Sequence, residues 1–177
     1  CLQMMDLANI PLTSQERAAA IQGSRRFLDG HPLVFAGGLS VTANPEPYAD
    51  FFDFIALGDG EIALPAIGQK IATVLRADPN VSREDLLLAL ARDVPGVYVP
   101  EFYEMDPVLG SVHPCQPEVP PRPQRQNAQP EPWRAMALVP HVGAVHDRLS
   151  IEIRRGCTRG CRFCLPGMVQ RPARDVA

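Results

Sequence analysis

Three cysteines within eight residues constrain this chain more than any other feature of its sequence. Cys157, Cys161 and Cys164 are spaced C-x3-C-x2-C. Thiolates are soft ligands that suit iron–sulfur clusters, zinc or Cu(I). Ligands three and four residues apart can wrap a compact cluster from one loop, and Gly156 and Gly160 allow the backbone to bend around it. Three protein ligands leave one metal position open for a ligand that is not protein.

Zinc and a disulfide are the alternatives for these thiols. A structural zinc site uses four ligands, and the nearest further candidate is His146, on the other side of an expected strand at residues 149–153. The remaining cysteines, Cys1 and Cys115, stand alone, and such thiols are usually small hydrophobic residues. Five cysteines, three of them clustered, fit a reducing compartment better than a disulfide framework. We therefore expect an iron–sulfur cluster in a cytoplasmic protein.

The stretch I-E-I-R-R-G-C-T-R-G-C-R-F-C at residues 151–164 resembles the opening of a radical S-adenosylmethionine (SAM) enzyme. The resemblance implies that Cys157, Cys161 and Cys164 bind three irons of a [4Fe–4S] cluster and that SAM chelates the fourth. It also implies that Phe163 lies near the adenine of SAM. In such enzymes the cluster donates an electron, the sulfonium C–S bond breaks, and a 5′-deoxyadenosyl radical removes hydrogen from a substrate. A flavodoxin or ferredoxin is the expected kind of electron donor.

Upstream of the cysteines, apolar runs predict an α/β domain in residues 1–106. The short continuous runs at 32–36 and 54–57 are typical of strands that are buried on both faces of a parallel sheet. Further elements are expected from caps and periodicity: helices at 14–28 (with a Thr13–Glu16 capping box), 45–52, 61–76 (with Pro65 in its first turn) and 82–92, and short strands at the sheet edge at 97–99 and 102–105. Alternating strands and helices predict a doubly wound, Rossmann-like domain that binds ligands at the carboxyl ends of its strands.

Glycines follow both of the expected buried strands. This region resembles the second half of the cobalamin-binding domain that precedes the radical SAM barrel in many such enzymes, where a glycine pair and a Gly-x-Gly-Glu sequence line the nucleotide-side groove. The resemblance implies that cobalamin is a second cofactor and that its groove is lined by Gly37, Gly38, Gly58, Gly60 and Glu61. Glycines at strand ends also make tight turns in any α/β domain, and Asp59 is equally a candidate cap for the next helix.

The histidine motif of the best-known cobalamin domains, D-x-H-x-x-G, is incomplete here. Asp29-Gly30-His31 begins the pattern, but Val34 stands at the glycine position, and the pattern precedes a strand instead of following one. We interpret His31 as a loop residue, so cobalamin is expected to bind without this ligand or through residues that are missing at the N-terminal side of the sequence.

Residues 107–148 are rich in proline, which predicts an extended linker. A PxxP motif that binds a partner is the less favoured interpretation. Trp133 is expected to pack this linker onto a domain, and His141 and His146 are interpreted as loop residues. Residues 149–177 are expected to begin the radical SAM (β/α) barrel. The resemblance implies that the segment with Arg171 and Arg174 leads into the first barrel helix. These arginines are expected either to neutralise the SAM carboxylate or a substrate anion, or to be solvated charges at the helix start.

Length and charge exclude several classes of function. The net charge of −3 gives no signal for nucleic acid, and no apolar run approaches the roughly 18–20 residues that span a bilayer. A barrel needs about 200 residues or more, so we expect a fragment of a longer protein that is inactive on its own. The rival functions are a metal-binding module without SAM chemistry and a radical SAM methylthiotransferase, whose three additional cysteines Cys1 and Cys115 cannot supply. The substrate and the outcome of the reaction are not indicated.

Overall fold

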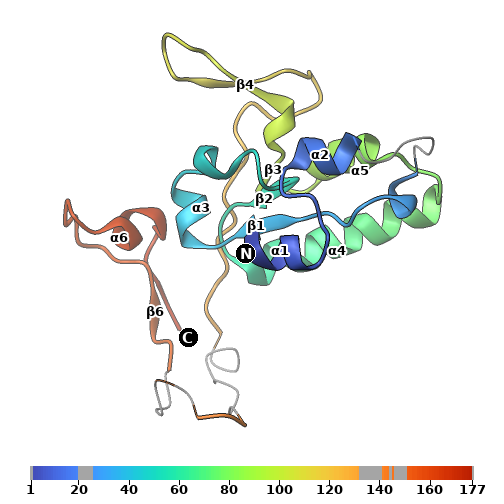
Figure 1. Cartoon of the computed structure of the whole chain (residues 1–177). Helices are drawn as coiled ribbons and strands as arrows, with labels where there is room; N and C mark the ends of the chain where they lie inside the picture. The colour runs from blue at the N-terminus through green and yellow to red at the C-terminus, as the bar shows by residue number, and fades with distance from the viewer. Residues whose placement is uncertain (1, 20–25, 132–140, 144, 146–150, 177) are drawn as a thin grey trace. The chain divides into compact units, whose positions relative to one another are not determined.

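The computed structural model describes residues 2–19, 26–131, 141–143, 145 and 151–176 of the chain (Figure 1). They belong to two compact units, Cys1–Gln126 and Asn127–Ala177. Among the described residues no helix combines the length and the apolar character needed to cross a membrane. The expectations for Cys1, Trp133, His146 and the first two residues of the 149–153 strand lie outside the described residues.

A three-stranded sheet organises the first unit. Strand β2 (Phe54–Ala56) lies between β1 (Phe35–Gly37), which is parallel to it, and β3 (Val97–Tyr98), which is antiparallel. Every residue of β2 is buried, as its continuous apolar run predicted. The same prediction is wrong for β1, because β1 is an edge strand and its Phe35 is 44% exposed.

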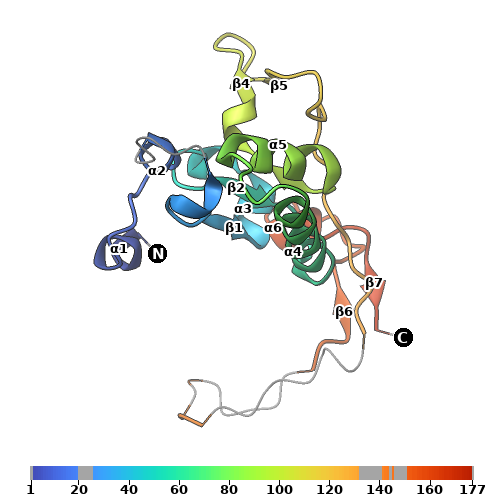
Figure 2. The same cartoon turned by 90° about the vertical axis from the view of Figure 1, so that its right-hand side faces the viewer.

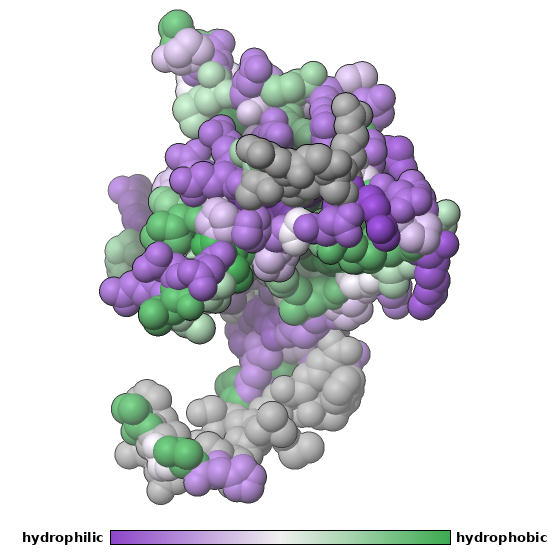
Figure 3. All heavy atoms as spheres, turned by 45° about the vertical axis from the view of Figure 1, so that its right-hand side comes forward, coloured by the Kyte–Doolittle hydropathy of each residue, from purple (hydrophilic) through white to green (hydrophobic). Residues whose placement is uncertain are grey.

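Helices pack on both faces of this sheet, which confirms a mixed α/β fold. On one face lie α4 (Gly60–Ala77) and α5 (Arg83–Asp93), which run side by side in Figures 1 and 2. They contribute Ala63, Ile67, Leu87, Leu90 and Ala91 to the core around Phe54 and Ala56. On the other face, Val41 of α3 (Leu39–Ala43) packs with Ile55 and Tyr98. On the side shown in Figure 3, hydrophobic residues lie among hydrophilic ones.

Local signals predicted helix beginnings well. Ser82 caps α5, since its Oγ accepts a hydrogen bond from the Asp85 amide at 3.0 Å. The capping box of α2 (Ser14–Ala19) is also confirmed: the Glu16 amide donates to Thr13 Oγ1 at 3.2 Å, and the Thr13 amide donates to Glu16 Oε2 at 3.1 Å. The expected helix at 61–76 is confirmed as α4, although Pro65 lies beyond its first turn.

Helix ends and short helices were predicted less well. The expected continuation of the 14–28 helix to Leu28 is wrong, because Arg26 is extended and Phe27–Asp29 form a 3-10 turn (η1). There the Phe27 amide donates to the Val81 carbonyl at 2.8 Å, so the backbone pairs with the loop before α5. Within the expected 45–52 helix only Glu46–Tyr48 are helical, as a 3-10 turn (η2). The short helix α1 (Leu2–Leu7) precedes α2.

A separate hairpin follows the sheet, formed by β4 (Tyr103–Met105) and β5 (Val112–Pro114). The expectation that residues 102–105 extend the main sheet is therefore wrong, because the 3-10 turn Pro100–Phe102 (η3) redirects the chain. Strand β5 belongs to the segment expected to be linker. The chain after β5 also packs on the first unit. The Pro120 carbonyl accepts a hydrogen bond from the Tyr103 hydroxyl at 2.7 Å, and Val119 is only 2% exposed. The first unit thus includes the proline-rich segment as far as Gln126.

The second unit is built on a two-stranded antiparallel ladder of β6 (Arg154–Arg155) and β7 (Arg174–Asp175), with the short helix α6 (Leu165–Val169) between them. Residues 151–153 are not a strand, so the described part of the expected 149–153 strand is wrong and the ladder begins at Arg154. The expected helix start at Arg171–Arg174 is also wrong: α6 follows Cys164 directly, and Arg174 belongs to β7.

Candidate metal centre

The cysteine segment is a loop whose two ends are joined by the β6–β7 ladder. Gly156, which enters the loop, has a φ of +80°, and a Cβ built there would lie 2.3 Å from the Gln170 carbonyl oxygen and 3.0 Å from that of Pro172. A side chain at residue 156 would therefore collide with backbone. The glycine that the sequence marked as a bend is the point where the two ends of the loop approach each other.

Arginine side chains hold this loop through its own carbonyl groups. Arg174 is 9% exposed, and it donates from Nε to the Pro172 carbonyl at 3.2 Å and from Nη2 to the Gln170 carbonyl at 3.3 Å. Arg171 Nη2 donates to the Arg159 carbonyl at 2.9 Å. These contacts give both arginines a structural role in the loop.

Both arginines of β6 are paired with carboxylates. Arg154 binds Asp175 through two hydrogen bonds, which lower the pKa of that carboxyl, and Arg155 binds both carboxylate oxygens of Glu152 at 2.8 Å. Two further positive side chains of the loop, Arg159 and Arg162, are exposed. The loop thus presents positive charge beside cysteines that become anionic when they bind metal.

All three cysteines have free thiols. The Arg159 amide donates to Cys157 Sγ at 3.3 Å, and the Cys164 amide donates to the Cys161 carbonyl at 3.1 Å. Cys157 and Cys164 both approach Gly167 in α6, whereas Cys161 is exposed. Among the residues described, no three His, Cys, Asp or Glu side chains are gathered closely enough to hold a metal. The loop contains the three candidate ligands, and their side chains would have to converge further to hold one metal.

The Phe163 side chain is 91% exposed. The described residues of the second unit leave most of its ring uncovered. An exposed aromatic ring between two cysteines is available to stack on a planar ligand.

The residues expected to line a cobalamin groove have different surroundings. A Cβ at Gly38, which has a φ of +99° and precedes α3, would meet no atom within 4 Å. Gly37 lies in β1 next to Ala56, and Gly60 and Glu61 form the first turn of α4. Asp59 is at the N-cap position of α4, but its side chain makes no capping hydrogen bond.

Gly58 faces the chain's own backbone. Its φ is +105°, and a Cβ there would lie 2.1 Å from the Gln126 carbonyl oxygen and 2.6 Å from the Gln126 nitrogen. The Gln126 amide donates to the Leu57 carbonyl at 3.0 Å, and the Asp59 amide donates to the Gln126 carbonyl at 2.9 Å, so Gly58 and Gln126 form a parallel bridge.

Gly96 also lies against the segment around Gln126. With a φ of +84°, a Cβ at Gly96 would lie 2.9 Å from Gln126 Cγ and 3.1 Å from the Gln124 carbonyl oxygen. Residues 124–126 therefore cover the carboxyl end of β2, where α/β sheets commonly bind ligands. The glycine at 58 is explained by this contact, which the sequence analysis did not predict because Gly58 and Gln126 are far apart in the chain.

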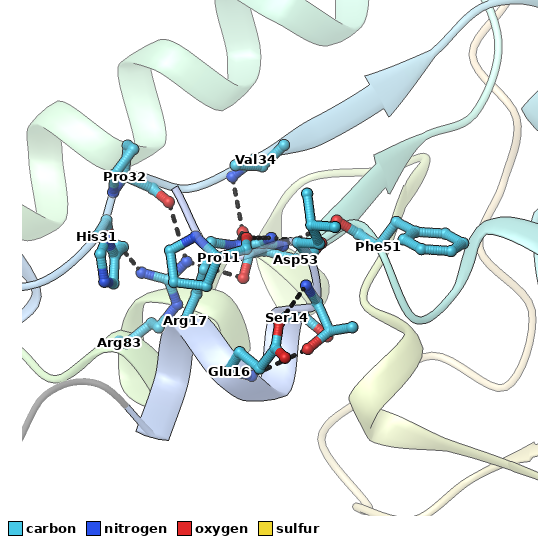
Figure 4. Close-up of polar contacts among 12 residues, drawn as sticks. Pro11, Ser14, Glu16, Arg17, His31, Pro32, Val34, Phe51, Asp53 and Arg83 are labelled. Carbon is cyan, nitrogen blue, oxygen red and sulfur yellow. Dashed lines mark hydrogen bonds and ion pairs between the residues drawn. The ribbon is translucent and has the colours of Figure 1, made fainter. Parts of the chain in front are cut away.

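A buried ion network, shown in Figure 4, is the other feature that sequence reasoning missed. Asp53 accepts hydrogen bonds from Arg17 and Arg83. Arg83 also donates from Nη1 to the His31 carbonyl at 2.7 Å, and His31 lies in the loop before β1. The loop interpretation of His31 is thus confirmed. Nothing in the spacing of these residues signalled the network, because its members come from four separate segments.

One comparison with known proteins identifies a family. The model of the family described as "Radical SAM proteins, N-terminal" matches residues 1–100. Neither a curated protein nor a solved structure matches the chain. The matched residues end before the cysteine loop, so the match and the C-x3-C-x2-C motif are separate observations.

Proposed function

The chain belongs to the family of radical SAM proteins, N-terminal, and we propose that Cys157, Cys161 and Cys164 hold a [4Fe–4S] cluster at which SAM is reductively cleaved. Radical SAM proteins in general are enzymes that use this cluster and SAM. The observation that carries the proposal is the agreement of two parts of the chain: a family match over residues 1–100 and, outside it, three free thiols spaced C-x3-C-x2-C.

The chemistry of the loop fits an iron–sulfur cluster with one open iron. The three thiols are the only cysteines in the described part of the second unit, so a fourth thiolate is not available there. The amide of Arg159 already donates to Cys157 Sγ, a contact that stabilises a thiolate. When bound, the cluster supplies one electron to SAM.

The chain's own residues would position SAM beside these thiols. Phe163 offers an exposed ring for the adenine. Arg159 and Arg162 are exposed and cationic, which suits the carboxylate of SAM. Gly156 and Arg174 keep the ends of the loop together while its cysteines converge.

Cobalamin is not part of this proposal. The groove that the sequence suggested would need space beside Gly58, and residues 125–126 fill that space at 2.1–2.9 Å from a Cβ position. The space around a Cβ position at Gly38 is empty, but empty space beside one glycine does not form a groove. The space beside Gly58 is therefore closed to the nucleotide tail of cobalamin.

The reaction needs an external reductant, and we propose a flavodoxin or ferredoxin. A low-potential donor of this kind and three reduced thiols fit a reducing compartment, which leads us to propose the cytoplasm. The substrate is the hydrogen donor to the 5′-deoxyadenosyl radical.

Anaerobic reconstitution with iron and sulfide tests the proposal directly. We expect about four irons per chain, as a [4Fe–4S] cluster requires, and an electron paramagnetic resonance signal of the reduced sample that changes when SAM is added. Cys157→Ala, Cys161→Ala and Cys164→Ala should each abolish the SAM-sensitive signal. Cys115→Ala is the matched control, because this thiol lies in the first unit and should leave the signal unchanged.

The rival functions give different results in the same experiment. A zinc module would bind one zinc and assemble no cluster, and a simple electron-transfer cluster would give a signal indifferent to SAM. A methylthiotransferase would bind a second cluster, which would raise the iron content to about twice that of a single [4Fe–4S] cluster. Each of these outcomes would overturn the proposed function.

A further inference from the structure

Gly167 in α6 lies against two of the three cysteines. It is the buried residue of that helix, which begins immediately after Cys164. A Cβ built on Gly167 would lie 3.2 Å from Cys164 Sγ, 3.7 Å from Cys164 Cβ and 3.9 Å from Cys157 Cβ. The bare backbone of residue 167 therefore faces the place where the first and third cysteines approach each other.

The backbone conformation does not explain why this residue is glycine. Its φ lies outside the left-handed range, unlike those of Gly58, Gly96 and Gly156. Within a helix, glycine is less favourable than alanine by about 1 kcal/mol. The helix α6 has only five residues, so few other residues stabilise it against this unfavourable propensity. A requirement for space remains as the physical reason.

That space lies where the sulfur atoms must move. A Cβ at 3.2 Å from Cys164 Sγ would be closer than the roughly 3.5–4.0 Å of an ordinary contact between non-bonded atoms. It would press on a sulfur atom that has to turn towards Cys157 and towards the exposed Cys161 for all three thiolates to reach one cluster.

We propose that Gly167 is a positioning residue of the metal-binding loop: the absence of a side chain lets Cys157 and Cys164 aim their thiolates at one iron–sulfur cluster. This inference rests on the proposed function. In this arrangement Cys157 and Cys164 form a pair around Gly167 before metal binds, with the Arg159 amide holding Cys157 Sγ. The exposed Cys161 then closes the site.

Metal binding by Gly167→Ala and Gly167→Val tests the inference. Co²⁺ is the first probe, because its absorption in a thiolate site reports the convergence of the cysteines without cluster assembly. We expect a loss of Co²⁺ affinity of about 10- to 100-fold for the valine variant, the range for losing the support of a metal ligand, and a smaller loss for alanine. Iron content after anaerobic reconstitution should fall in the same order. Gly143→Ala is the matched control, because a Cβ there meets no atom within 4 Å.

Hydrogen exchange of residues 151–176 in the metal-free variants separates positioning from folding. If valine at residue 167 disrupts the β6–β7 ladder, the inference is judged from the Co²⁺ affinity and iron content of the alanine variant, which adds a single methyl group. Unchanged Co²⁺ affinity and iron content in a variant that keeps the ladder would overturn the inference and leave the proposed function standing. If the parent chain binds neither metal through its cysteines, both proposals fail.

Discussion

Arg17 donates from its Nε to Oδ2 of Asp53 across 3.1 Å, and the two side chains are only 0% and 2% exposed. The second oxygen of Asp53 accepts from Arg83 Nη2 at 2.8 Å, and the Val34 amide donates to Oδ2 at 2.6 Å. The remaining donors of Arg17 reach the carbonyl groups of Pro11, Leu12 and Phe51. The Asp53 carboxylate thus connects α2, the residues that directly precede β1 and β2, and the first residue of α5 (Figure 4).

Replacing this carboxylate should destabilise the first unit strongly. In Asp53→Asn the two buried guanidinium groups lose their counter-charge, and breaking a buried ion pair in this way costs about 3–5 kcal/mol. Urea unfolding followed by circular dichroism measures the loss. Asp50→Asn makes the same chemical change at an exposed side chain and should alter stability by less than about 0.5 kcal/mol. Equal stability of the two variants would contradict the structural role of the network.

Gly58→Ala should destabilise the first unit and release residues 124–126. Alanine at a φ of +105° is strained, and its Cβ would meet the Gln126 carbonyl oxygen at 2.1 Å. The strain alone is of order 1–3 kcal/mol, and the clash with backbone adds to it. Thermal unfolding and limited proteolysis near Gln126 are the measurements. As the control, Gly68→Ala lies within α4 with no atom within 4 Å of its Cβ, and it should stabilise by up to about 1 kcal/mol.

Glu101 should make the stability of the first unit depend on pH. Burial raises the pKa of this carboxyl, and the charges of Glu84 and Asp53 raise it further, against a smaller opposing effect of Arg83. The folded state therefore holds this proton more tightly than the unfolded state does. The stabilisation that this tighter proton binding provides is fully present at pH values below the ordinary glutamate pKa. It is lost as the pH rises through the raised pKa of Glu101 in the folded state.

The variant Glu101→Gln removes that titration. It should be more stable than the parent at neutral pH, and the difference should shrink as the pH falls to the ordinary glutamate pKa. Thermal melts over a pH series measure this. A stability difference that does not change with pH would show that Glu101 titrates normally.

Arg174→Lys should loosen the cysteine loop without removing charge. Lysine lacks the planar fork with which Arg174 reaches the Pro172, Ala128 and Gln170 carbonyl groups. Losing about 1.5 kcal/mol of charge-assisted hydrogen bonding should speed amide exchange in residues 151–176 roughly tenfold. Hydrogen exchange of β2 and α5 should be unaffected. Arg162→Lys, at an exposed position in the same loop, should exchange like the parent chain.

Several elements followed from sequence because their determinants are local. The caps of α2 and α5 use hydrogen bonds between residues three apart, and the buried strand β2 is a continuous apolar run. The spacing of Cys157, Cys161 and Cys164 defined the candidate ligands in the same way. These features depend on neighbours in the chain, so no knowledge of the folded state was needed.

Tertiary structure alone decided the features that join distant segments. Phe27 leaves the helical pattern because its amide pairs with Val81, and β4 leaves the main sheet because β5 offers it a partner. Gly58 is glycine because Gln126 crosses it, and Asp53 is buried with two arginines from other segments. Neither periodicity nor spacing encodes which segments meet, because that choice depends on the packing free energy of the whole unit. The sequence by itself determined the candidate metal ligands of this protein, because their spacing is local, whereas the fold determined which glycines lie against backbone and which one lies against the thiols.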